Sequence, residues 1–373
     1  MATPTENASG SLPTSLASLR ALVEGPNTIG ASRRFWVGFA VVLVALLAYP
    51  VIAGSYAASR LSLFVVYAFL GLSLAIVWGY TGVLSFGQVA FFGAAGYTFG
   101  VISVNFSTPL GITAAFLLAI VAGAGLAFVL GYFMFYGGVR DVYVTIITLV
   151  STLVLHTFMA QTAGSQWTIG EAALGGFNGM PTIPDLAFGV GGFALTFSDM
   201  TFYYFVVALL CATYLGLRAV VNSDYGRVMV ATREDEDRTR MFGYDVKRVK
   251  LAVFTFGGAL AGLSGVLYAS WGNYINPDVF SLTFASLPVV WVSVGGRKTL
   301  LGAVLATIGV QWFSNILSGQ LAFIIVGVLL LTVILVLPEG AVPRLHDYYV
   351  RYVADRQEGD GVDDATRPTE VAE

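Results

Sequence analysis

The sequence predicts an all-α membrane protein, a polytopic bundle of about ten transmembrane helices with both termini in the cytoplasm. Residues 61–139 and 142–170 contain no Asp, Glu, Lys or Arg, whereas fourteen charged residues fall within 218–250. An ionised side chain at the centre of a membrane helix costs about 2.5–3.5 kcal/mol on insertion scales. The uncharged stretches therefore belong in lipid, and the charged stretch belongs in water.

The overall composition supports the same fold class. Of 373 residues, 57% are hydrophobic and 11% are charged, and the mean hydropathy is +0.78, whereas soluble domains carry about 25% charged residues. The net charge of −3 gives no reason to expect a nucleic-acid partner. Cys211 is the single cysteine and His156 and His346 are the two histidines, so we expect no intrachain disulfide, no Cys/His metal site and no cofactor.

Individual spans follow from the length of each apolar run. A helix needs about 20 mainly apolar residues to cross the hydrocarbon core. Ten segments are candidates, and the eighth is short enough that it is expected to reach only part of the way. In chain order they are 35–53, 61–79, 81–104, 110–136, 142–160, 201–219, 251–271, 284–295, 300–317 and 321–337.

Lys and Arg in the short loops predict the orientation, because cytoplasmic loops carry an excess of them. Residues 161–200 contain neither, so they form an extracytoplasmic loop, whereas residues 221–250 form a basic cytoplasmic loop. If successive spans alternate in direction from these two loops, all the remaining basic loops and both ends of the chain lie in the cytoplasm, with Arg60 as the one exception. The predicted parts are a flexible cytoplasmic tail at 1–32, a membrane domain at 33–340 and a cytoplasmic tail at 341–373.

The segment 79–100 combines glycines with two polar side chains inside an apolar run. Glycines in membrane helices either allow close packing or break the helix beside a cavity. We interpret Gly93, Gly96 and Gly100 as packing positions. An amide in hydrocarbon needs a partner, so Ser85 and Gln88 favour an interrupted helix that faces a passage as much as they favour packing.

The charged loop at 226–250 is mixed in sign but not uniformly polar. Ala231, Met241, Phe242 and Val246 are apolar among the charges. A short helix with an apolar stripe and a charged rim is typical of docking to a partner protein. The alternative is a solvated amphipathic hairpin, and we favour docking.

Motifs for catalysis and nucleotide binding are absent from the sequence. The run Gly295-Gly296-Arg297-Lys298-Thr299 lacks the upstream glycine and the Gly-Lys pair of a phosphate loop, and it is interpreted as a tight turn between membrane segments. No G-x-S-x-G, H-E-x-x-H or pair of intramembrane carboxylates is present. His156 stands alone in its span, so we expect a hydrogen-bonded helix residue, and the chain is not expected to be an enzyme.

Several of these segments, in order, carry a resemblance to a known family. Residues 82–97, with Gly82-Val83-Leu84-Ser85-Phe86-Gly87-Gln88, Phe91, Phe92, Gly93 and Tyr97, resemble the permeases of the branched-chain amino acid and urea ABC importer family. The turn Gly175–Gly179, the loop from Gly226-Arg227 to Gly243 and the segment 261–269 resemble it as well. The resemblance covers about residues 61–338.

The resemblance implies a set of partners and a location. It implies a multi-pass subunit of the cell membrane that pairs with a second, homologous permease, two cytoplasmic ATPases and an extracytoplasmic substrate-binding protein. Such permeases dock their ATPase through a Glu-Ala-Ala-x-x-x-Gly loop. In this chain Asp237, Arg238 and Thr239 occupy the first three positions and Gly243 the last, so both alanines are replaced.

These interpretations give two groups of candidate functional residues. Ser85, Gln88 and Tyr97 are expected to line the translocation pathway, with Asn178 and Asn276 in its outer vestibule. The ATPase coupling loop is expected to use seven residues of the charged hairpin: Ala231, Glu234, Asp237, Met241, Phe242, Gly243 and Tyr244.

The substrate and the rival functions stay open at this stage. The segments 275–277 and 294–303 resemble the urea and short-amide branch, whereas 179–184 is compatible with the amino-acid branch, and we favour urea or short amides. An ion-coupled secondary transporter usually places Asp, Glu or His within the membrane, and a passive channel has no need of a docking loop. A membrane enzyme lacks candidate catalytic groups.

Overall fold

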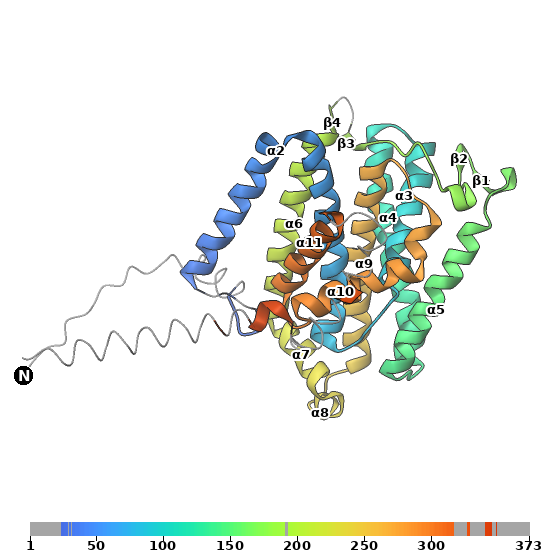
Figure 1. Cartoon of the computed structure of the whole chain (residues 1–373). Helices are drawn as coiled ribbons and strands as arrows, with labels where there is room; N and C mark the ends of the chain where they lie inside the picture. Colours follow the sequence, from blue (N-terminus) through green and yellow to red (C-terminus); the bar gives the residue numbers. More distant parts are fainter. Residues whose placement is uncertain are drawn as a thin grey trace, which may run out of the picture.

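The computed structural model describes residues 24–28, 30, 32–190, 193–316, 327–328, 340–344 and 348. The tenth predicted span, 321–337, lies outside these residues except for two positions. Most of the two predicted tails, 1–32 and 341–373, lies outside them as well. The described part is mainly helical, as predicted (Figure 1).

The first two predicted spans form one bent helical unit. Helix α2 covers Arg33–Leu74 and continues as a π-helix, η1, over Ala75–Gly79. Gly54 interrupts α2 with a φ of 84° and a ψ of 171°. In Figure 1 the helix reverses at this bend, so that its first arm leans away from the bundle and its second arm descends within it. The predicted spans 35–53 and 61–79 coincide with these arms.

The third span begins later than predicted. Helix α3 covers Gln88–Asn105, and residues 82–87 are not helical. The predicted start at Thr81 is therefore wrong. Gly82 has a φ of 81°, a left-handed conformation that ends the preceding helix and that non-glycine residues rarely adopt. Packing and an interrupted helix were the two alternatives that Ser85 and Gln88 left open, and the structure shows an interruption at this segment.

Four further spans lie close to their predicted positions. They are α4 (Pro109–Tyr136), α5 (Asp141–Ala160), α6 (Asp199–Asn222) and α9 (Val246–Gly272). Local signals fix several ends: Thr108 caps α4 by accepting a hydrogen bond from the Gly111 N–H at 3.2 Å, with Pro109 in the first turn. Asn273 ends α9 in a left-handed conformation.

Helix α9 lies at the centre of the bundle and contacts α2, α3 and α4. Its glycines allow this packing, because Gly258, Gly262 and Gly265 recur on one face. A Cβ placed on Gly265 would lie 1.9 Å from the Phe92 carbonyl oxygen of α3, and one on Gly262 would lie 3.5 Å from the Cα of Gly123 in α4. Backbone therefore meets backbone where these helices cross.

The loop at 161–200, predicted to be extracytoplasmic and called the outer loop below, departs from the all-helical fold class. It holds two antiparallel hairpins, β1 (Thr168–Ile169) with β2 (Ala172–Ala173), and β3 (Leu186–Val190) with β4 (Phe193–Phe197). Between them the Met180 N–H donates to the Ile275 carbonyl at 2.7 Å, and the Ile275 N–H donates back at 3.2 Å. The loop is thereby fixed against the segment that follows α9.

The last described helices form a bent pair. Helix α10 (Leu282–Gly295) and α11 (Leu300–Ile316) meet at 120°. With 14 residues, α10 is about 21 Å long, which is shorter than the hydrocarbon core of about 30 Å. This agrees with the prediction that the eighth segment reaches only part of the way.

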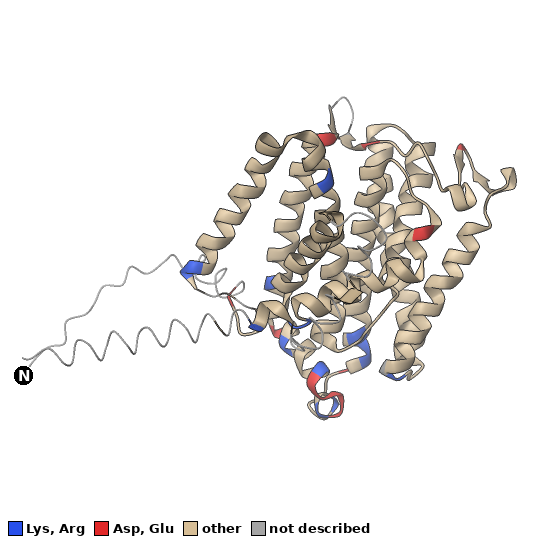
Figure 2. Ribbon diagram, in the orientation of Figure 1, with Lys and Arg blue, Asp and Glu red and all other residues tan. Residues whose placement is uncertain are grey.

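Charged residues concentrate at one end of the bundle (Figure 2). The short helices α7 (Asp224–Glu234) and α8 (Glu236–Met241) form the charged hairpin there. Within the described residues, five helices are long and apolar enough to cross a membrane, or six if α10 and α11 count as one span. The count of ten and the cytoplasmic position of both ends stay predictions.

The central packing predicts different outcomes for two glycine substitutions. Gly265→Ala places a methyl group against the Phe92 backbone, and overpacking of this kind costs about 1–3 kcal/mol. Gly125→Ala in α4 is the control, because a Cβ there meets nothing within 4 Å and alanine favours a helix by about 0.5–1 kcal/mol. Thermal unfolding of the purified proteins in detergent should show a lower Tm for Gly265→Ala only. Equal Tm values would contradict this packing.

Candidate functional site

The non-helical segment 82–87 is bound by a row of threonines on α5. Thr145 Oγ1 donates to the Leu84 carbonyl at 3.0 Å, and the Phe86 N–H donates to Thr148 Oγ1 at 3.2 Å. Thr152 Oγ1 lies 3.4 Å from the Phe86 carbonyl. Backbone groups without helical partners must be satisfied by protein where water is absent. The threonine hydroxyls provide these hydrogen-bond partners and hold α5 against the non-helical segment.

Ser85 and Gln88, two of the predicted pathway residues, lie at this break and inside the subunit. Each is 1% exposed. The Ser85 hydroxyl accepts from the Gly87 N–H at 3.0 Å, and Gln88 Oε1 accepts from the Ser73 hydroxyl at 2.5 Å. Within the described part of the chain, Gln88 Nε2 has no hydrogen-bond partner. Gln88 thus joins α3 to α2 while one of its polar groups stays unsatisfied.

The other three predicted pathway residues, Tyr97, Asn178 and Asn276, gather around the segment that follows α9. Tyr97 stacks on Phe280 of the short helix η4 (Pro277–Phe280), with ring centroids 6.0 Å apart. Asn276 donates to Asp278 Oδ2 at 2.9 Å, and the Asn178 carbonyl accepts from the Tyr274 hydroxyl at 2.7 Å. The structure therefore brings these three into one outer group, separate from Ser85 and Gln88.

The outer group includes an acid and a base that the sequence analysis did not connect. His156 Nε2 of α5 lies 4.0 Å from Asp278 Oδ1. The side chain of His156 is 29% exposed and that of Asp278 is 76% exposed. The sequence analysis predicted that His156 stands alone. In the structure it faces a carboxylate from a distant part of the chain instead. A polar residue in a membrane span was the available signal.

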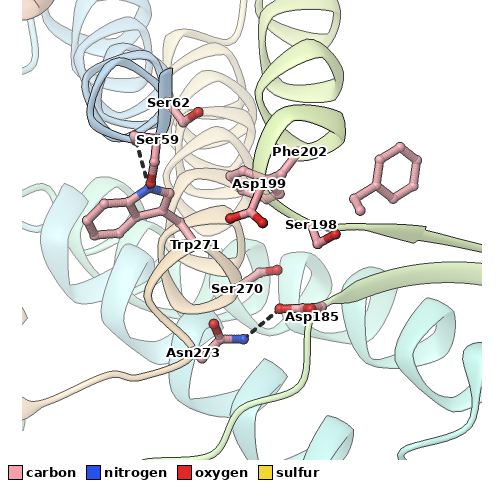
Figure 3. A pocket seen from close by; sticks show the side chains of 10 residues that line it. Ser59, Ser62, Asp185, Ser198, Asp199, Phe202, Ser270, Trp271 and Asn273 are labelled. Carbon is pink, nitrogen blue, oxygen red and sulfur yellow. Dashed lines mark hydrogen bonds between the residues drawn. The ribbon is translucent and has the colours of Figure 1, made fainter. Parts of the chain in front are cut away.

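A separate polar hollow opens at the same end of the bundle as the outer loop (Figure 3). It has a volume of about 250 Å³ and lies between the second arm of α2, the start of α6 and the end of α9. Asn273 donates to Asp185 at 2.9 Å, and the Trp271 indole donates to the Ser59 carbonyl at 2.8 Å. None of the predicted site residues lines this hollow, because its members come from four distant segments.

At the other end, the charged hairpin is tied to the membrane helices by Arg233. Its guanidinium donates to the Gly79 carbonyl at the end of η1 and to Glu234 Oε1. Arg233 thereby holds the pKa of Glu234 below its ordinary value, and Lys298 contributes as well. Lys298, in the turn between α10 and α11, lies 3.6 Å from Glu234 Oε1. One ionic cluster thus joins the hairpin, η1 and the bent pair.

All seven predicted coupling residues lie on α7, α8 or the turn after them. Met241, Phe242 and Tyr244 are 86%, 81% and 51% exposed, respectively. Ala231, Glu234 and Asp237 are also exposed, and Gly243 has a φ of 88° that reverses the chain beside them. Large apolar side chains exposed on a charged hairpin form a surface suited to a protein partner.

Comparison with known proteins gives one family. The family described as "Branched-chain amino acid transport system / permease component" matches residues 56–338. The LivM high-affinity branched-chain amino acid permease protein of Escherichia coli K12 is 25% identical over 348 residues, which cover 86% of this chain and 79% of that protein. A probable LivM protein of Methanocaldococcus jannaschii is 24% identical, over 75% of this chain and 91% of that protein.

A further relative belongs to a different import system and matches a smaller part of this chain. The LsrC permease protein of the autoinducer 2 import system of Salmonella paratyphi B is 25% identical over 213 residues, which cover 55% of this chain and 54% of that protein. No solved structure matches the chain.

The threonine row predicts a specific loss of stability. Thr148→Val keeps the shape of the side chain but removes the acceptor of the Phe86 N–H, and an unsatisfied buried donor costs about 1–3 kcal/mol. Thr157→Val is the matched control, because that hydroxyl is exposed and, among the residues the structure describes, donates only to the Leu153 carbonyl of its own helix. We expect a lower Tm and faster amide exchange at 84–87 for Thr148→Val alone. Unchanged exchange there would contradict the role of α5.

Proposed function

This chain belongs to the family of permease components of branched-chain amino acid transport systems, and on that premise we propose that it forms half of an ATP-driven import pathway. In this proposal a second, homologous permease supplies the other half, two cytoplasmic ATPases drive the cycle and an extracytoplasmic binding protein delivers the solute. The chain itself is a multi-pass membrane protein and a transporter subunit rather than an enzyme.

The outer group supports the position of the pathway. Asp278 is exposed and His156 is partly exposed in the isolated subunit, and charged or polar groups near lipid are stable only beside water or a partner. We propose that this face, which also carries Asn276 and Asn178, borders the aqueous vestibule where the binding protein docks. Tyr97 lies just behind it, 5% exposed and stacked on Phe280.

Ser85 and Gln88 would then act at a later point along the pathway. They are buried at the interrupted helix, where non-helical backbone needs either protein partners or a cavity. We propose that solute reaches them when the subunits move, and that the unsatisfied amide of Gln88 gains a hydrogen bond from the solute or from water. Until then the threonine row of α5 satisfies the backbone of the break.

The charged hairpin is the proposed site of coupling to the ATPase. Met241 and Phe242 are the apolar contacts, and the charged residues around them set the orientation. The contacts of Arg233 with Gly79 and of Glu234 with Lys298 offer a direct connection from the hairpin to η1 and to the turn between α10 and α11. Movement of the ATPase would reach the membrane helices through this cluster. This ionic connection between the hairpin and the membrane helices is the observation that favours an ATP-driven importer over a secondary transporter or a passive channel.

We propose branched-chain amino acids as the first substrate class, because the matching family and the LivM relatives are named for them. Urea or a short amide, favoured by the sequence around Asn276 and at 294–303, is the second. Both are small polar solutes, and both are consistent with an amide-rich outer group. Uptake of labelled leucine and labelled urea by the assembled importer separates them.

The coupling role predicts a loss of uptake without a loss of folding. Gly243→Trp places a bulky side chain beside the exposed docking surface, at a position whose positive φ disfavours any residue but glycine. We expect uptake of the transported solute to fall to background while the protein stays in the membrane. Gly54→Trp is the control, since Gly54 also has a positive φ and open space around it but lies at the α2 bend. Normal uptake by Gly243→Trp would contradict docking through this hairpin.

A further inference from the structure

A basic cavity lies beside the charged hairpin, between the α4–α5 turn, α8 and the start of α9. Its volume is about 430 Å³, and its lining includes four cationic residues and, among the described side chains, one carboxylate. The cations are Arg140, Arg240, Lys247 and Lys250, and the carboxylate is Glu236. We propose that this cavity binds the phosphate-bearing headgroup of an anionic phospholipid.

The charges in the cavity are only partly balanced by the protein. Glu236 pairs with Lys250 and, at 3.3 Å, with Arg240, and Arg240 also reaches Asp237 at 3.0 Å. Arg140 and Lys247 are exposed, and neither has an ion-pair partner among the residues the structure describes. Two cations facing an open cavity provide the charge that a phosphodiester requires.

An aromatic ladder leads from the cavity along α4. The Lys247 ammonium lies 5.8 Å from the ring centroid of Tyr136. Tyr136 stacks on Tyr132 at 4.9 Å, and Tyr132 stacks on Phe128 at 6.2 Å. These three rings are 39–48% exposed. Tyrosines at the level where charge gives way to apolar surface are typical of the headgroup region of a bilayer.

The far end of the ladder opens on an apolar groove. Phe128 lines a largely apolar hollow of about 500 Å³ between α4 and α9, together with Leu251, Ala252 and Phe256, and Arg248 is the charged residue of its lining. A free phosphate ion would use only the basic cavity and would leave this groove unexplained. A phospholipid uses both, with its headgroup on Arg140 and Lys247 and an acyl chain along the groove. Continuity between the charged and apolar surfaces therefore favours a lipid as the occupant.

The test measures lipid retained by the purified full chain, using native mass spectrometry with phosphatidylglycerol and phosphatidylcholine. We expect preferential binding of phosphatidylglycerol. The double variant Arg140→Gln, Lys247→Gln should bind it about 25-fold more weakly, since each cation near a bilayer surface contributes about 1 kcal/mol, or about fivefold. Arg227→Gln is the control, because that residue pairs with Asp224 on α7 and does not line the cavity.

The other outcomes identify the other occupants. Equal retention of both lipids, or unchanged affinity in the double variant, would overturn the proposal. Inorganic phosphate that displaces phosphatidylglycerol at comparable concentration would show an anion site with no need of a lipid, and this would also overturn it. Weaker co-purification of the ATPase with no change in lipid binding would assign the cavity to the protein partner. The single variant Lys247→Arg keeps the charge and should keep the binding that Lys247→Gln loses, and a Tm equal to that of the wild type confirms that each variant is folded.

Discussion

The structure depends on the exclusion of unpaired polar groups from hydrocarbon. That constraint explains why the break at 82–87, within an otherwise apolar stretch, lies against Thr145, Thr148 and Thr152 rather than against lipid. It also explains why charged residues concentrate around α7 and α8 (Figure 2). Helices inside the bundle associate through close backbone contact instead, as at Gly262 and Gly265 of α9.

The same constraint separates the candidate functional groups into three layers. The outer group around Tyr274 and Asp278 keeps exposed polar side chains on one face of the subunit. The inner cluster around Arg233 and Glu234 connects a hairpin with exposed apolar residues to η1 and to the α10–α11 turn. Between them lies the interrupted helix with Gln88. The proposed transport cycle needs these three layers to act in sequence.

Hydropathy was sufficient to predict α4, α5, α6 and α9, because each is a long apolar run with clear ends. It was not sufficient for α3, whose true start depends on the backbone conformation of Gly82 and on hydrogen bonds from a different helix. The bend at Gly54 was predicted only as a gap between spans. The two hairpins of the outer loop were missed, because their strands are short and pair with each other rather than following a helical period.

The sequence could nominate candidate site residues one by one, but it could not show which of them lie together. Tyr97, Asn178 and Asn276 were chosen separately, and only the fold shows that all three surround the segment after α9. The contact between His156 and Asp278 joins α5 to η4, and no local pattern relates two such distant positions. Likewise, the cations of the basic cavity come from three elements that the sequence does not mark as neighbours.

The central claim is that the ionic hairpin and the outer loop lie on opposite sides of one membrane. Single cysteines in a Cys211→Ser background test it most directly, because both positions are exposed: Met241→Cys in the hairpin and Phe177→Cys in the outer loop. With an impermeant maleimide on intact cells, Phe177→Cys should be labelled at once and Met241→Cys only after permeabilisation. Labelling of Met241→Cys in intact cells would contradict the account.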